Sequence, residues 1–250
     1  TLFGRNTSAG AISVVTAGPD FSPGMYLEGQ FAMDDLEETG VRAGVNIPVN
    51  DRLAFRFDGA IRARDGYVTD LISGSDINNR DRWTARGQAL WDISDDASLR
   101  IIVDASESDE VCCGITPLIY GSTQNAITAI VGPAGTPAIN LEGHGMTVTP
   151  RGLGLPSLGP GLPAQPATNA RNYGDATEDV GVSAQLDWDI GGIALTSITS
   201  VRDWKQTRNQ DIDFNLIDIA YRSGVEVGVE NLTQEIRLQG EFGRVNWLAG

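Results

Sequence analysis

The sequence has few basic residues, a single histidine and only two cysteines. Its 250 residues include 18 Lys and Arg against 33 Asp and Glu, a formal net charge of −15. This balance argues against a nucleic-acid binder, because neutralising phosphates requires a basic surface. With only His144, Cys112 and Cys113 available, a zinc ribbon, a histidine-rich metal site and a disulfide framework are excluded. No apolar run of about 18 residues occurs, so no transmembrane helix is predicted.

Apolar residues instead recur at every second position over long stretches, which is the pattern of strands with one apolar face. Such stretches are 25–33, 41–47, 53–64, 82–93, 99–105, 180–190 and 232–242. Between Leu53 and Arg64, for example, the odd positions are mainly apolar and the even ones mainly polar. The run Ile193–Arg202 has no clean face, so its inner and outer sides stay undecided.

Alternation alone fits a soluble β-sandwich as well as a membrane β-barrel. The predicted strands run about nine to eleven residues, the length that a tilted strand needs to cross hydrocarbon, whereas soluble strands usually have about five or six. The bulky aromatics fall near strand ends, as an interfacial girdle requires: Phe55, Trp83, Trp91, Trp188, Phe242 and Trp247. These features favour the barrel.

The predicted connections alternate between short and long. Short turns are expected at 48–52, 94–97, 191–192 and 243–244, and long loops at 66–79, 107–177 and 206–229, with 34–38 the one short member of that set. Tight periplasmic turns and extended extracellular loops alternate in this way. The stretch 107–177 is rich in Gly and Pro and has no periodic face; it is either a mobile surface loop or a lid that captures a ligand.

The first sixteen residues, Thr1–Thr16, resemble the end of the plug domain of TonB-dependent outer-membrane receptors. In that family a leucine-aromatic-Gly-Arg-Asn turn precedes small residues and an Ile/Val strand ending in Thr. The matching positions are Gly4, Arg5, Asn6 and Gly10. One departure is Ala17-Gly18-Pro19, which stands where basic residues are commoner before the proline.

The resemblance implies an all-β fold: the last plug strand at 1–20, then the N-terminal part of an antiparallel transmembrane β-barrel at 21–250. About eight to nine of the family's 22 strands would be present. The chain starts without Met and stops within an expected strand, so we expect a piece of a longer receptor. The implied function is uptake of a scarce, bulky nutrient, a ferric siderophore above all, without enzymatic activity or a cofactor.

The resemblance also implies partners and a location. The family works in the outer membrane of Gram-negative bacteria with the TonB–ExbB–ExbD complex, which it contacts through a region upstream of this sequence. The alternatives are a passive, porin-like channel, disfavoured by the plug strand, and a soluble all-β binding domain.

The candidate ligand-binding residues are arginines on the polar face of the expected strands. Arg62, Arg64, Arg82 and Arg86 should gather near the extracellular mouth, where they either attract an anionic cargo or pair with plug carboxylates. The acidic pairs Asp34-Asp35, Glu37-Glu38 and Asp95-Asp96 fit solvated turns better than catalysis. The adjacent Cys112 and Cys113 form a vicinal disulfide, pair elsewhere in the full receptor or remain free.

Overall fold

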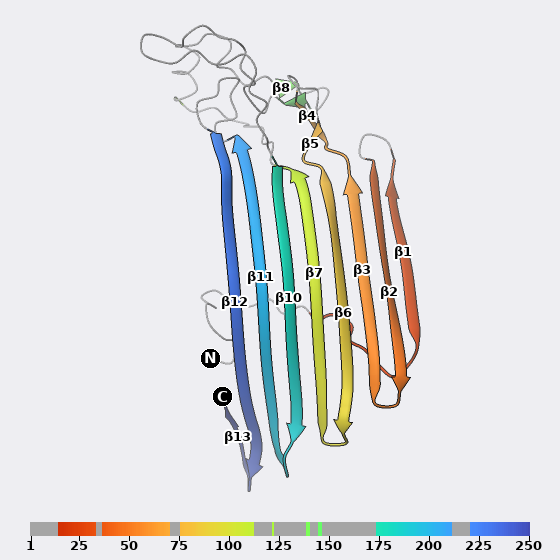
Figure 1. The fold of residues 1–250 in the computed structure, drawn as a ribbon, viewed down its shortest axis with the longest axis vertical. Coiled ribbons are helices and arrows are strands. Elements are labelled where there is room, and N and C mark those ends of the chain that lie inside the picture. The colour runs from red at the N-terminus through yellow and green to blue at the C-terminus, as the bar shows by residue number, and fades with distance from the viewer. Residues whose placement is uncertain are drawn as a thin grey trace.

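A computed structural model describes residues 15–33, 37–70, 76–112, 122, 139–140, 145–146, 174–211 and 221–250. The elements formed by these residues are strands, nine of which join in one antiparallel sheet (Figure 1). None of the described residues belongs to a helix with the length and hydropathy needed to span a bilayer. The all-β, antiparallel fold predicted from the alternation is confirmed.

The strands of the large sheet follow one another in chain order, with two short strands between β3 and β6 in the sequence and two more between β7 and β10. In spatial order they are β1 (Gly24–Ala32), β2 (Glu38–Asn50), β3 (Leu53–Arg64), β6 (Arg80–Ser94), β7 (Ala97–Val111), β10 (Gly174–Asp189), β11 (Ile193–Asp211), β12 (Tyr221–Phe242) and β13 (Val245–Ala249). A second, 4-stranded sheet lies at the upper end in Figure 1 and contains β4 (Val68–Asp70), β5 (Asp76–Ile77), β8 (Ile139–Asn140) and β9 (Gly145–Met146).

One face of the large sheet is apolar. Directly opposed residues on antiparallel neighbours share a face. One such row crosses eight strands and consists of Met25, Val45, Phe57, Gly87, Val103, Val182, Val201 and Leu232. The large side chains in this row are exposed, Met25 at 88% and Leu232 at 72%. An apolar face of this width needs an apolar partner or surrounding.

Tryptophans lie at the upper and lower borders of this apolar face. On β6, Trp83 lies toward the upper end and Trp91 toward the short turns, and both are partly exposed. The separation of eight residues corresponds to about 27 Å at the rise of an antiparallel strand, close to the apolar band of a transmembrane barrel. The indole nitrogen of Trp83 donates to Glu107 at 3.1 Å. In the row of Trp83 the same face becomes charged on the following strands, with Glu107 opposite Trp83 and Glu178 opposite both Glu107 and Lys205.

The strands are longer than the alternation predicts. They reach 22 residues in β12 and 19 in β11, against the expected nine to eleven. β7 extends to Val111 and β10 begins at Gly174, so both ends of the loop expected at 107–177 belong to strands. Much of the loop expected at 206–229 is likewise part of β11 and β12. The extensions of β7, β10 and β11 have no alternating apolar face that would reveal a strand in the sequence. The extension of β12 does have one, although it falls within the loop predicted from the sequence; it is formed by Val225, Val227 and Val229.

The register resolves the orientation of Ile193–Arg202. Val201 is opposite Val182 and Leu232, and Leu195 is opposite Trp188 and Leu238, which places both on the apolar face. The sequence hides this face because Ser197 and Thr199 lie on it as well, whereas Ile198 lies on the polar side, opposite Gln185.

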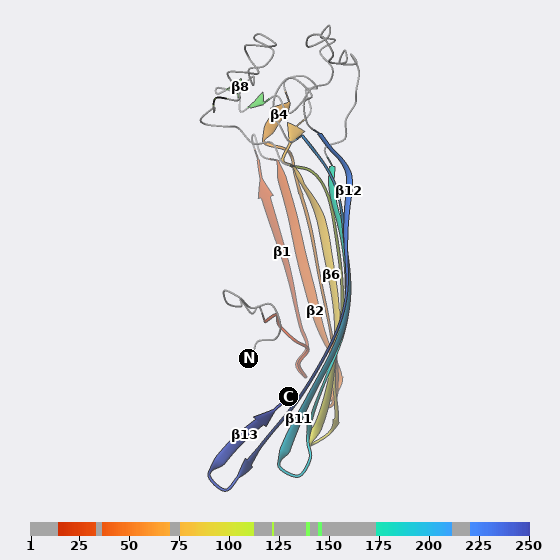
Figure 2. The same ribbon diagram turned by 90° about the vertical axis from the view of Figure 1, so that its left-hand side faces the viewer.

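The segment that precedes β1 lies on the polar face. Figure 2 shows the sheet curving around the side on which this segment runs. Arg86 on β6 donates to the Thr16 hydroxyl at 2.9 Å, and Gln88 donates to the Ala17 carbonyl oxygen at 2.9 Å. The polar face is therefore the inner one.

Candidate functional site

A trough of about 840 Å³ lies on the polar face, against the segment before β1. Its floor comes from strands between β1 and β11. Among its lining residues are four arginines and four carboxylates: Arg42, Arg56, Arg86, Arg202, Glu28, Asp58, Asp104 and Asp179. The wall is thus balanced in charge rather than cationic.

Most of these charges are already paired along or across the strands. Arg56 makes two bonds to Asp58, at 2.8 and 2.9 Å. The guanidinium of Arg202 bridges two carboxylates, at 2.8 Å from Asp104 and 2.6 Å from Asp179. Such bidentate and bridging contacts fix both position and orientation.

Two glycines let side chains cross a whole strand. Gly181 on β10 lies between Arg202 on β11 and Asp104 on β7, and a Cβ there would come within 2.6 Å of the guanidinium. Gly44 on β2 lies between Tyr26 and Asp58, whose side chains hydrogen-bond over it at 3.1 Å. Both glycines therefore hold polar side chains flat against the wall.

Arg86 differs from the other arginines of the trough. The two carboxylates directly opposite Arg86 already form ion pairs with other arginines: Asp58 with Arg56, and Asp104 with Arg202. Within the part of the chain that the structure describes, its bond is to the neutral hydroxyl of Thr16. Of the four arginines predicted from the sequence, this one lines the trough.

The other three predicted arginines lie higher on the same face. Arg62 and Arg82 are directly opposed on β3 and β6, as are Arg64 and Arg80. Carboxylates from the two flanking strands compensate them. Glu38 on β2 binds Arg62 at 2.9 Å, and Glu110 on β7 binds Arg80 at 3.1 Å and also Arg82.

Arg64 has a different environment. It donates to the backbone oxygen of Asn78 at 2.7 Å and lies over the Tyr67 ring, 5.2 Å from the centroid. The predicted arginines therefore share a face but not one pocket. Sequence reasoning missed Glu38 and Glu110 as their partners, because both fell in expected loop ends.

Several other predicted residues fall outside the described residues. These are the plug motif at Gly4, Arg5, Asn6 and Gly10, and also His144 and Cys113. Cys112 is disulfide-bonded. Its pairing with Cys113 stays a prediction, as do the boundaries of the plug and barrel domains.

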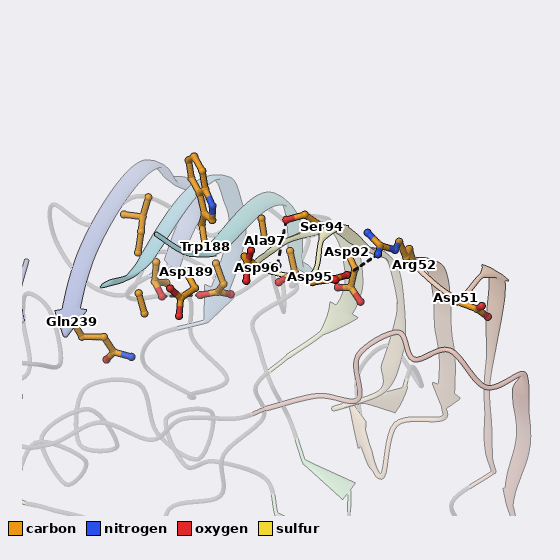
Figure 3. Close-up of a pocket in the computed structure, with 15 residues that line it drawn as sticks. Asp51, Arg52, Asp92, Ser94, Asp95, Asp96, Ala97, Trp188, Asp189 and Gln239 are labelled. Carbon is orange, nitrogen blue, oxygen red and sulfur yellow. Dashed lines mark hydrogen bonds and ion pairs between the residues drawn. The ribbon is translucent and has the colours of Figure 1, made fainter. Parts of the chain in front are cut away.

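A second hollow lies at the short-turn end and is acidic. It is lined by Asp51, Asp92, Asp95, Asp96, Asp187 and Asp189, among others, and Figure 3 shows Arg52 bonded to Asp95 at this rim. That ion pair measures 2.6 Å. Among the described residues, no group of three or more His, Cys, Asp or Glu side chains is arranged to hold a metal ion.

No protein-family model matches the sequence. The fold is similar to that of a solved structure, a mutant of the ferric enterobactin receptor from Pseudomonas aeruginosa, with a TM-score of 0.59 and 10% identity. The likeness covers 96% of this chain and 31% of the receptor, so the chain spans about a third of the length of the protein it matches. At this identity the likeness concerns the fold alone: the chain has an antiparallel sheet with the fold of part of a β-barrel.

Proposed function

We propose that this chain is the N-terminal part of the barrel of a TonB-dependent outer-membrane receptor that imports a ferric siderophore or a similar bulky nutrient. One observation carries the proposal. A tall antiparallel sheet presents an exposed apolar face bounded by tryptophans, while the chain preceding its first strand is bonded to the opposite, polar face. This is the arrangement of a lipid-facing wall around a filled lumen.

The segment on the polar face also favours a filled barrel over a passive channel. A porin-like channel keeps its lumen open to water. Here residues 16–22 lie against the polar face, and Thr16 and Ala17 line the trough. In this proposal the TonB–ExbB–ExbD complex supplies the energy and the outer-membrane lipid covers the apolar face. Arg86 is then the preferred contact for an anionic cargo.

Two measurements on the full-length protein test the proposal. It should fractionate with the Sarkosyl-insoluble outer membrane. Cells that carry it should accumulate radiolabelled iron–siderophore under iron limitation, and a protonophore should abolish that uptake. Recovery of the protein in the soluble periplasm would contradict the membrane location, and uptake that survives the protonophore would point to a passive channel.

A further inference from the structure

The segment before β1 is attached to the sheet unequally along its length. At its C-terminal end, the Asn46 amide group donates to the backbone oxygens of Asp20 at 2.8 Å and Ser22 at 2.6 Å. The Asn46 side-chain oxygen accepts from the Asp20 amide at 3.1 Å. Asn46 is 4% exposed, so these bonds are shielded from water.

The N-terminal end of the segment has weaker attachments. Arg86 reaches Thr16 through one exposed bond to a hydroxyl, and Gln88 reaches the Ala17 carbonyl oxygen through another single bond. The side-chain oxygen of Gln88 also accepts a hydrogen bond from Arg100 at 2.8 Å, so the position of the Gln88 side chain does not depend on the segment. Breaking the Thr16 and Ala17 contacts costs Arg86 and Gln88 one hydrogen bond each, and of the two only Arg86 lines the trough.

Breaking the Asn46 contacts would have a larger cost. Asn46 would lose three hydrogen bonds to the backbone of Asp20 and Ser22, whereas release at the other end breaks one bond of Arg86 and one of Gln88. Gln88 is as buried as Asn46, at 3% against 4% exposed, so the difference lies in the number of bonds. Pro19 and Pro23 flank this end and restrict its backbone, which lowers the entropy gained on release.

We propose that residues 16–22 form a latch with a fixed end and a releasable end. Asn46 holds Asp20–Ser22 against β2 throughout the working cycle, while Thr16–Ala17 detach from Arg86 and Gln88. Release leaves the Arg86 guanidinium, whose carboxylate neighbours are already paired, free to contact an anionic group in the trough. The release of Thr16–Ala17 and the exposure of Arg86 rest on the proposed transport function. The fixed attachment at Asn46 concerns the chain alone.

Amide hydrogen exchange on the full-length protein in detergent tests the fixed end without any cargo. The Asp20 amide should be protected in the wild type, and Asn46→Ala should speed its exchange at least about tenfold, which corresponds to about 1.4 kcal/mol of lost hydrogen bonding. Asn231→Ala is the matched control. Asn231 lies on β12, on the same polar face of the sheet as Asn46, and is exposed, so its substitution should not change the exchange of the Asp20 amide. Fast exchange of Asp20 in the wild type would overturn the fixed end.

Cross-linking tests the releasable end. One variant carries Asp20→Cys with Asn46→Cys and another Ala17→Cys with Gln88→Cys, each joined by a short bis-maleimide; the disulfide-bonded Cys112 does not compete for the reagent. Uptake of labelled iron–siderophore should stay within about twofold for the first cross-link and fall at least about tenfold for the second, relative to the same variants before cross-linking. Loss of uptake in both, or in neither, would overturn the latch. A wild type that imports nothing would refute the proposed function but leave the exchange result standing.

Discussion

Arg202 and Gly181 are directly opposed on β11 and β10, and the guanidinium of Arg202 occupies the space that a side chain at residue 181 would need. The arginine can therefore lie across β10 and reach Asp104 on the strand beyond. The same device recurs at Gly44, over which Tyr26 reaches Asp58. In both places a missing Cβ permits a polar contact between strands that are not neighbours.

Gly181→Ala should displace Arg202 from Asp104 and lower the free energy of unfolding by about 1–3 kcal/mol, the usual cost of overfilling a packed site. The measurement is thermal unfolding of the full-length protein in detergent. Gly59→Ala is the control, because its Cβ would meet the Thr84 oxygen at an ordinary 3.6 Å. Equal stability of the Gly181 variant and the wild type would mean that the Arg202 bridge contributes nothing.

A charge on the apolar face should impair assembly in the membrane. Val182→Arg places a guanidinium in the middle of that face, and a lipid-facing arginine near the bilayer midplane costs about 2–4 kcal/mol. Ser183→Arg, the next residue on β10, places the same charge on the polar face and should assemble normally. The fraction of heat-modifiable, folded receptor on gels measures the difference. A larger folded fraction for Val182→Arg than for Ser183→Arg would contradict the assignment of the faces.

Arg82 and Glu110 should act as a coupled pair. Arg82→Gln leaves Glu110, which is 7% exposed, with less compensation and should be destabilising by about 1–3 kcal/mol. Adding Glu110→Gln should recover part of that loss, since the unpaired buried charge is then removed. A double-mutant cycle in guanidinium unfolding measures the coupling. Strictly additive effects would show that the pair does not interact.

Arg86→Gln should weaken the uptake of an anionic cargo without affecting assembly. The substitution removes one bond to a hydroxyl and one positive charge from the trough. Uptake should become slower and less sensitive to salt, because the attraction between exposed charges is screened. Lys205→Gln, a loss of positive charge on the other face of the sheet, is the control. Unchanged uptake by Arg86→Gln would leave this arginine as a contact of the preceding segment alone.

The 250-residue chain expressed alone should require detergent. Its apolar face is exposed along much of the sheet, and large hydrophobic side chains such as Phe242, at 83%, have no cover. Among the described strands, β1 is also at the edge of the sheet, which favours aggregation. Size-exclusion chromatography with light scattering checks this. A monodisperse soluble monomer would contradict both the aggregation and the membrane assignment.

The sequence by itself determined the fold class and the sidedness of most strands. Alternation with period two assigns each residue of a strand to a face, so the spacing of Val180, Val182 and Leu186 is enough to place them on the apolar side. The short turns were also predictable, because Gly191 and Gly192 adopt the positive φ that turns require. These features depend only on neighbours in sequence.

Tertiary structure decided everything that depends on pairing between strands. Only the register shows that Val201 lies on the apolar face, since Ser197 and Thr199 share that face and blur the pattern. It also extends β7, β10 and β11 past the apolar band, where hydrogen bonds to a neighbouring strand continue without an apolar face.

The partners of the arginines were likewise beyond sequence reasoning. Arg82 and Glu110 are 28 residues apart, and Arg202 and Asp104 are 98 residues apart. A charge pattern read along the chain counts arginines but cannot reveal which carboxylates neutralise them, because those carboxylates arrive from adjacent strands. The sequence therefore predicted a cationic wall or a plug contact, whereas folding brings together a wall whose positive and negative charges largely compensate each other.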